Sequence, residues 1–437
     1  MSPPQSATHP HDPVPGSLRV MSLRLISLAW RNLWRNRRRT LITVSTIAVG
    51  FALGVFSIGL GDGGHNQMIR NAINMGDGHL TIQPAGYLAT PSNQSYLPDG
   101  EGLSTLPPFV PAEADIAPRI FLQVLVATAY NSIGAGLQGV DMAADPLGTM
   151  MRPKLVEGAW PVPEDRLGVV IGRKMAEKLK ARVGSKLVIM AGGEDGTVES
   201  RLGRVRGIFR SGLSQLDGFL VLSGLGFARP LLPGYNADRD GAAVTRLAVF
   251  LSTPDDQEPL KQALIDLPLP APAVVLDWEE MMPQVVNFVI VDDFFNYIWM
   301  VFVLAMVAFG IINTILMSTL ERTREFGLLQ ALGMKSRHMF VLVLCETVLL
   351  AGVALAMGWL LGGSLHAYFA IEGMDFSGLY PDGVETAGMF MEPILYPELS
   401  AGRVWALTVI VFITTLASGI YPAIKAARIT PMAALRT

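Results

Sequence analysis

Charge and cysteine are both scarce in this chain. Only 16% of its 437 residues are Asp, Glu, Lys or Arg and 50% are hydrophobic, whereas a typical soluble domain is roughly 25% charged. Part of the chain is therefore expected to lie outside water. Cys345 is the only cysteine, so no disulfide framework can stabilise a domain exposed to an oxidising compartment. Such a domain must depend on its own hydrophobic core.

Motifs that mark enzymes are missing as well. The sequence contains no G-x-x-x-x-G-K-[ST], H-E-x-x-H or G-x-S-x-G, and its six histidines are scattered. The glycine-rich run at 134–139 has the wrong spacing for a phosphate loop and is expected to be a turn within a sheet. We therefore expect no enzymatic activity, no cofactor or metal on this chain, and no nucleic-acid partner.

Four long apolar runs are present instead. Each has at least the roughly 17 residues that a helix needs to cross the hydrocarbon core of a membrane, and the only Asp, Glu, Lys, Arg or His residues in them are Glu346 and His366. The first run exceeds the 7–15 residues of a signal-peptide core and lacks a clear cleavage site, so we expect an uncleaved helix. The runs are residues 41–60, 294–320, 340–370 and 404–420.

This pattern predicts an α-helical membrane protein with four transmembrane helices and a large α+β extracytoplasmic domain inserted between helices 1 and 2. We expect membrane helices at 41–61, 292–320, 339–368 and 403–423, and a two-lobed extracytoplasmic domain at 62–291. The remaining parts are a tail at 1–20, an amphipathic helix at 21–40, a cytoplasmic loop at 321–338, an outer loop at 369–402 and a tail at 424–437.

The distribution of basic residues predicts the orientation. Arginines precede the first run, Lys and Arg follow the second run and the fourth, but the loop between the third and fourth runs has only Arg403 among several acidic residues. Because Lys and Arg are enriched in cytoplasmic loops, both termini are expected in the cytoplasm and the large domain outside. The arginines before the first run are Arg24, Arg31, Arg35, Arg37, Arg38 and Arg39.

Short β-branched and aromatic runs predict strands within 62–291. They lie at 79–83, 119–130, 169–171, 187–190, 204–209, 219–222, 246–252 and 274–276. Helices are expected at 66–75, 172–184 and 255–265, and at 278–291 as a continuous extension of the second membrane helix. The Pro-rich and Gly-rich segments 84–118 and 230–241 are expected to be loops, and are candidate surfaces for a partner.

Three residues inside the third run could have a special role. Glu346 is an acidic residue in an apolar span, which makes it a candidate for proton or substrate binding, although pairing across a helix interface is the favoured interpretation. Gly358 and Gly362 have the small-xxx-small spacing that permits close helix contact. Helix packing is expected for both.

The cytoplasmic loop carries the most specific pattern, ERTREFGLLQALGMKSRHM at 321–339. Its apolar residues are flanked by charge over a length too short for a domain. A short amphipathic helix of this kind can dock into a groove of another protein. The alternative is a turn that rests on the bilayer surface.

In this loop and elsewhere, the chain resembles ABC-transporter permeases of the MacB/FtsX/LolC–LolE (type VII) superfamily. The resemblance rests on the loop and on three more segments in the same order: AWRNLWRNRRRTLITV, CETVLLAGVALAMGWLLGG and YPAIKAARITPMAALR. GHLTIQPAGY, VRGIF and LQGVD are similar to the LolE-like, lipoprotein-releasing branch.

The resemblance implies that the loop is a coupling helix that contacts an ATPase subunit. Phe326 stands where many relatives have isoleucine. The implied coupling residues are Glu321, Arg324, Glu325, Phe326, Gly327, Leu329, Ala331, Leu332 and Gly333. Tyr421, Pro422, Ala423, Ala426, Ala427, Arg428, Pro431 and Leu435 match the C-terminal signature of the family.

The resemblance also implies partners and a location. These are a dimer of cytoplasmic ABC ATPase subunits that bind ATP and Mg²⁺, a second permease, a lipoprotein substrate and a periplasmic carrier, all at the bacterial inner membrane. ATP hydrolysis would move the outer domain and release lipoproteins. A MacB-like efflux permease and an FtsX-like signalling scaffold that transports nothing are the alternatives.

Overall fold

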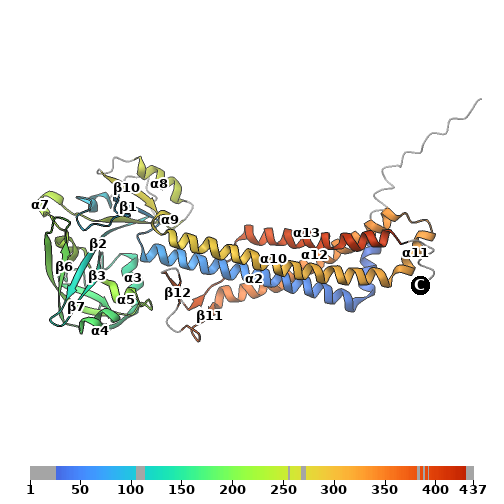
Figure 1. The fold of residues 1–437 in the computed structure, drawn as a ribbon, viewed down its shortest axis with the longest axis horizontal. Helices are drawn as coiled ribbons and strands as arrows, with labels where there is room; N and C mark the ends of the chain where they lie inside the picture. The colour runs from blue at the N-terminus through green and yellow to red at the C-terminus, as the bar shows by residue number, and fades with distance from the viewer. Residues whose placement is uncertain are drawn as a thin grey trace, which may run out of the picture. The chain divides into compact units, whose positions relative to one another are not determined.

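The structure of the protein, a computed structural model, describes residues 26–104, 114–253, 256–266, 272–380, 384–386, 389–391 and 393–429. These residues form two compact units (Figure 1). The first contains the described residues up to Gly64, Asp292–Met374 and those from Leu395 onward. The second contains the described residues of His65–Val291 and Asp375–Ile394.

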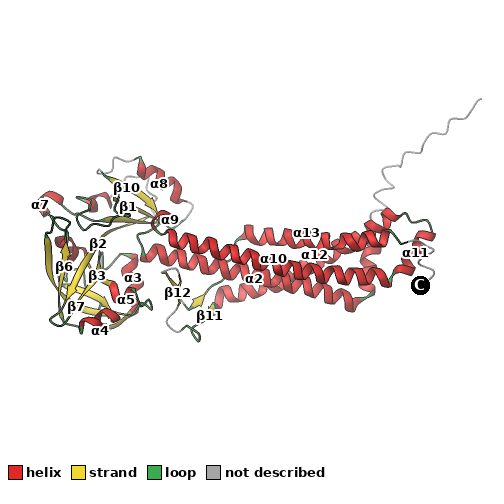
Figure 2. Ribbon diagram, in the orientation of Figure 1, coloured by secondary structure: helices red, strands yellow, loops and turns green. Residues whose placement is uncertain are grey.

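Long helices build the first unit (Figure 2). They are α2 (Arg37–Met75), α10 (Pro283–Glu321), α12 (Ser336–Glu372) and α13 (Ala401–Ala427). All four are long and apolar enough to cross a membrane, which confirms the expected helical membrane fold. A helical segment at 26–35 precedes α2, and the short helix α11 (Thr323–Ala331) lies between α10 and α12.

Two helix boundaries differ from those expected. α2 does not end near 61 but continues to Met75, because its glycines serve packing rather than termination: a Cβ on Gly63 would collide with the backbone of Tyr396 and Pro397. The expectation of a continuous helix over 278–291 is wrong. Helix α9 (Trp278–Met281) stops before Met282, and α10 starts at Pro283, because proline disfavours the helical conformation in the residue before it.

The second unit is an α+β domain, as expected, and ten of its strands form one sheet. In the described residues the strand order is β10-β1-β9-β2-β3-β8-β5-β7-β4, and β6 pairs with β2 and β7. The strands are β1 (Leu80–Pro84), β2 (Asp115–Ala127), β3 (Ser132–Val140), β4 (Leu155–Gly158), β5 (Gly168–Gly172), β6 (Lys186–Gly192), β7 (Val198–Phe209), β8 (Leu220–Gly224), β9 (Arg246–Phe250) and β10 (Ala273–Asp277).

Short helices connect these strands and cover the sheet (Figure 1). They are α3 (Pro146–Met151), α4 (Arg173–Leu179), α5 (Leu216–Phe219), α6 (Leu225–Ala228), α7 (Ala237–Asp240) and α8 (Gln257–Ile265). Side chains alternate along β2 and β6, so that Leu122, Val126 and Ile189 are fully buried in the core. This core stabilises the unit without disulfides.

Three expectations in this unit are wrong. The run at 134–139 is not a turn but part of strand β3, where Gly136 packs so closely against Phe121 and Phe219 that a Cβ would collide with them. Strand β2 begins at Asp115, inside the loop expected at 84–118. The segment 230–241 contains helix α7, whose Asn236 caps the N-terminus.

Candidate functional site

Helix α11 is short because a glycine just after it ends the helix. The N–H of Gly333 bonds to the carbonyl of Gln330, and the N–H of Met334 bonds to the carbonyl of Leu329, at 3.0 Å each. Gly333 has a φ of +98°, a conformation that favours glycine, and α12 starts three residues later. The sequence therefore presents one separate helix between two membrane helices.

The two faces of α11 differ in exposure. Phe326 is 1% exposed and packs with Ala29, Met339 and Ala423. Leu328 and Leu332, in contrast, are 61% and 77% exposed. The helix is thus anchored by one aromatic side chain and presents apolar side chains outward.

An ion pair fixes α11 to the helical segment 26–35. The guanidinium of Arg35 lies 2.7 Å from the carboxylate of Glu325, and that of Arg322 lies 3.3 Å from it. Burial alone would raise the pKa of Glu325, but the hydrogen bonds and charges of the two arginines outweigh it and lower this pKa. Glu325 is therefore an anion over the whole neutral range.

A second pair joins α2 to α10 at the same end of the bundle. Arg39 donates to Glu321 at 2.5 Å. Both side chains are partly exposed, so this contact alone contributes little, but it belongs to a set of charges on the helical segment 26–35, α2, α10, α11 and α12. Such networks are stronger than isolated surface pairs.

Glu346 has its partners within this network. Arg322 binds both of its carboxylate oxygens, at 3.0 and 3.1 Å, and the side-chain amide of Asn32 donates to it at 2.8 Å. The carboxylate is 16% exposed. Glu346 is thus a paired, hydrogen-bonded charge in a helix interface, which agrees with the interpretation that it pairs across helices.

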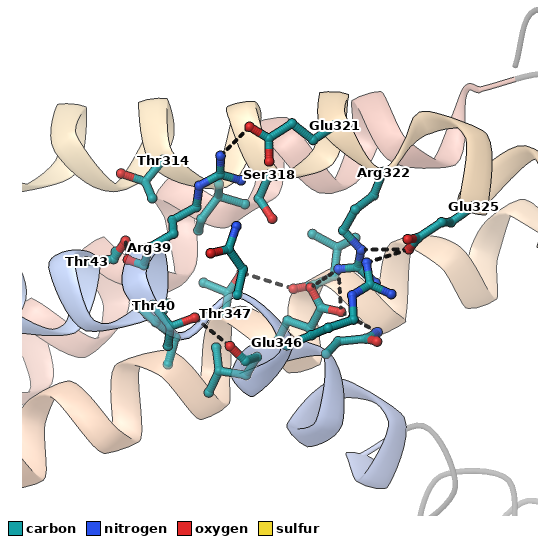
Figure 3. Close-up of a pocket in the computed structure, with 17 residues that line it drawn as sticks. Arg39, Thr40, Thr43, Thr314, Ser318, Glu321, Arg322, Glu325, Glu346 and Thr347 are labelled. Atoms are coloured by element: carbon teal, nitrogen blue, oxygen red, sulfur yellow. Dashed lines mark hydrogen bonds and ion pairs between the residues drawn. The ribbon is translucent and has the colours of Figure 1, made fainter. Parts of the chain in front are cut away.

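These side chains line a cavity of about 320 Å³ (Figure 3). Hydroxyl groups of Thr40, Thr43, Thr314, Ser318 and Thr347 complete its wall. The cavity has both polar and apolar lining, the latter from Leu33, Ile315, Val343 and Leu350, and it contains three arginines and three glutamates, whose charges balance.

The remaining predicted residues lie as follows. Arg324, Ala331 and Gly333 are exposed, Leu329 is half-buried, and Gly327 is buried. In the C-terminal signature, Pro422, Ala423 and Ala426 are buried on α13, whereas Pro431 and Leu435 lie outside the described residues. The proposed coupling residues thus lie on α11 or directly next to it, with Glu321 at the end of α10 and Leu332 and Gly333 after α11, but only some of them face outward.

The glycines of α12 lie against α2. A Cβ on Gly358 would come within 2.8 Å of Phe51, and one on Gly362 within 3.0 Å of Ala52. Small residues at this spacing allow the two backbones to approach closely.

A second cavity, which sequence analysis did not predict, lies deeper in the bundle. It measures about 290 Å³ and is lined by α2, α10 and α13, mainly with apolar side chains such as Phe51, Met300, Val303 and Leu407. Single apolar residues in a membrane helix carry no signal of such a cavity, because lipid-facing and cavity-facing positions have the same composition.

Comparison with known proteins gives a consistent result. The MacB-like periplasmic core domain family matches residues 40–267, more than half of the chain, and the FtsX-like permease C-terminal family matches residues 297–431. The lipoprotein-releasing system transmembrane protein LolC of Neisseria meningitidis is 22% identical over 73% of this chain and 77% of its own length.

Two further proteins are similar to this chain. An uncharacterised ABC transporter permease of Methanocaldococcus jannaschii is 23% identical over 94% of this chain and 97% of its own length. Among solved structures, the periplasmic region of MacB from Actinobacillus actinomycetemcomitans is similar with a TM-score of 0.34 and 15% identity, over 50% of this chain and 98% of that one.

Proposed function

Because the chain belongs to the MacB/FtsX/LolC superfamily of ABC-transporter permeases, we propose that its ATPase is a dimer of separate cytoplasmic subunits that docks on α11. ATP and Mg²⁺ then bind to that partner. The observation that carries this proposal is the division of α11 into a buried anchor, Phe326, and the exposed side chains Leu328 and Leu332. An apolar face of this kind fits a groove of a partner protein.

The test is co-purification with a cytoplasmic ABC ATPase subunit that is produced together with the permease. In detergent, Leu328→Asp with Leu332→Asp should abolish capture of the ATPase by the tagged permease. Ser336→Asp is the matched control, since it adds a carboxylate at an exposed position at the start of α12, where an acidic residue is favourable. Docking on α11 is wrong if the double variant still captures the ATPase.

We further propose that the substrate carries acyl chains, as a lipoprotein does. The apolar cavity between α2, α10 and α13 supports this, since it could hold hydrocarbon within the bundle. In proteoliposomes with the ATPase, a fluorescent lipoprotein should be released to a soluble carrier when ATP is added. Val303→Trp, which fills the cavity, should reduce release severalfold.

Val301→Trp is the control for that experiment. Val301 lies on the same helix but is 62% exposed, so the larger side chain points away from the cavity. Equal release by both variants would argue against an acyl chain in this cavity. ATP hydrolysis without any release of lipoprotein would instead favour an efflux or signalling role.

Assembly and orientation complete the proposal. The arginines at 35–39 lie at the same end of the bundle as α11, which supports a cytoplasmic location for that end and for both termini.

We also propose a second permease in the complex, supported by the exposed aromatic side chains of α10, such as Trp299 and Phe302. Light scattering of the solubilised complex would give the number of permease copies.

Helix α10 is continuous from Pro283 to Glu321, which supports mechanical coupling between α11 and the domain inserted before α10. A movement of α11 could pass along α10 to the domain inserted before it. A flexible Gly-Ser insertion after Val291 should therefore preserve ATPase binding but abolish substrate release. Unchanged release in that variant would exclude rigid transmission through α10.

A further inference from the structure

Three membrane helices are joined at one end by a single arginine. Arg403 of α13 donates to Asp62 of α2 at 2.8 Å and makes two hydrogen bonds to Asp293 of α10, at 2.9 and 2.7 Å. The three residues lie at the end of the bundle that α2 and α10 connect along the chain to residues 65–291. The carboxylates of Asp62 and Asp293 are only 8% and 19% exposed.

The three charges depend on one another. A buried carboxylate next to apolar helix surface is costly unless a cation and hydrogen bonds compensate it. Arg403 supplies both, and its planar guanidinium suits the two oxygens of Asp293. The backbone N–H of Ser400 adds a further hydrogen bond to Asp62, at 3.3 Å.

These residues stand beside the apolar cavity described above. A smaller cavity of about 200 Å³ is lined by Asp293, Asn296, Tyr297 and Arg403. The two cavities share part of their lining, namely Ile58, Asn296, Met300 and Leu407. Arg403 therefore lies in the wall of the smaller cavity, which adjoins the apolar cavity through these four residues.

We propose that Asp62, Arg403 and Asp293 form a latch that closes this end of the apolar cavity. α10 cannot move away from α2 and α13 until Arg403 releases Asp293. Because Asp62 also binds Arg403, the guanidinium keeps a partner after this release, whereas Asp293 loses its cation. Release is therefore costly, and the closed state is favoured. Access to the cavity is thus controlled by one ion pair.

Reactivity of a cysteine placed in the cavity tests the latch. Met300→Cys, in a chain with Cys345→Ser, has a single thiol in the wall that both cavities share. The measurement is the rate at which a membrane-impermeant maleimide labels it in spheroplasts. Arg403→Met and Asp293→Asn should each raise this rate about fivefold or more, since each removes charge-assisted hydrogen bonds.

Two further variants make the result specific. Exchange of the charges, by Arg403→Asp with Asp293→Arg, is combined with Asp62→Asn so that the new carboxylate does not face that of Asp62. This variant should return the labelling rate to within about twofold of the parent chain. Trp405→Leu is the matched control on α13, because Trp405 is 66% exposed and outside both cavities. The Trp405→Leu substitution should leave the labelling rate of the cysteine at position 300 unchanged.

The possible outcomes separate clearly. Faster labelling in both latch variants, with recovery in the exchange, supports the latch. Asp293→Asn is nearly isosteric, so it decides the matter alone if Arg403→Met fails to fold. An unchanged rate in Asp293→Asn, or an equal increase in Trp405→Leu, overturns the proposal. The labelling requires no ATPase or substrate, so it does not depend on the transport function proposed above.

Discussion

The guanidinium of Arg119 makes two hydrogen bonds to the carboxylate of Asp145, at 2.9 and 2.6 Å, and both side chains are buried in the second unit. Arg119 also donates to the carbonyl of Gly76, directly after α2, and packs against the ring of Phe250. Asp145 in turn caps α3. One arginine thereby joins the end of α2 to the sheet and to a covering helix.

Arg119→Met should lower the free energy of unfolding of this unit by about 3–5 kcal/mol, because it leaves the charge of Asp145 buried without its cation. The measurement is denaturant unfolding of the solubilised protein. Arg173→Met is the control, since its pair with Glu177 is exposed and should contribute less than about 0.5 kcal/mol. Equal effects of the two substitutions would contradict a structural role for Arg119.

The two glycine positions of α12 allow a second test. Gly358→Val should destabilise the bundle by about 1–3 kcal/mol, because the added carbon atoms collide with Phe51 and with the carbonyl of Ala48. Gly363→Val is the control, since no atom lies within 4 Å of a Cβ there. Thermal unfolding in detergent should distinguish them. A control that is as unstable as Gly358→Val would mean that the valine itself, rather than contact with α2, is responsible.

Much of the fold could be predicted from the sequence. An apolar run of twenty residues has few interpretations other than a membrane helix, and β-branched runs marked most strands. The helix ends were harder. α2 continues through Gly63 because the backbone near Tyr396 approaches it, and that contact is invisible in a local sequence.

The site was only partly predictable, for the same reason. Asn32 and Glu346 are 314 residues apart in the chain, so the fold alone brings them together. The sequence did contain one signal: a carboxylate in an apolar span needs a cation. However, Lys335 and Arg337 are nearer to Glu346 in the chain than its actual partner, Arg322. Arg403 was considered only for orientation, and its two carboxylate partners lie on distant helices.

Glu346 was left with two interpretations by the sequence, and its substitution separates them. Glu346→Ala should destabilise the first unit by about 1–3 kcal/mol, because Arg322 and Asn32 lose their shared partner. Glu346→Gln keeps an oxygen acceptor and should retain most of the stability. Thermal unfolding and ATP-driven release are the measurements. If Gln preserves folding but abolishes release, Glu346 carries a proton or substrate and the structural role is insufficient.

His79 makes the stability of the second unit depend on pH. Its Nδ1 accepts a hydrogen bond from the backbone N–H of Leu251 at 3.0 Å, so the ring in the folded protein is neutral, with its proton on Nε2. Burial lowers the pKa of His79 below its ordinary value. The unfolded chain therefore binds this proton at a higher pH than the folded protein does.

The sign of the effect follows from this order. The contribution of neutral His79 to stability is complete above its unfolded pKa of about 6.5, and it is lost as the pH falls from there toward the lowered folded value. One proton gives a slope of at most about 1.4 kcal/mol per pH unit. Denaturant unfolding between pH 8 and pH 5 should show a shallower loss of stability in His79→Gln than in the parent chain. Parallel curves would mean that His79 is protonated equally in both states, and that the hydrogen bond from Leu251 does not depend on a neutral ring.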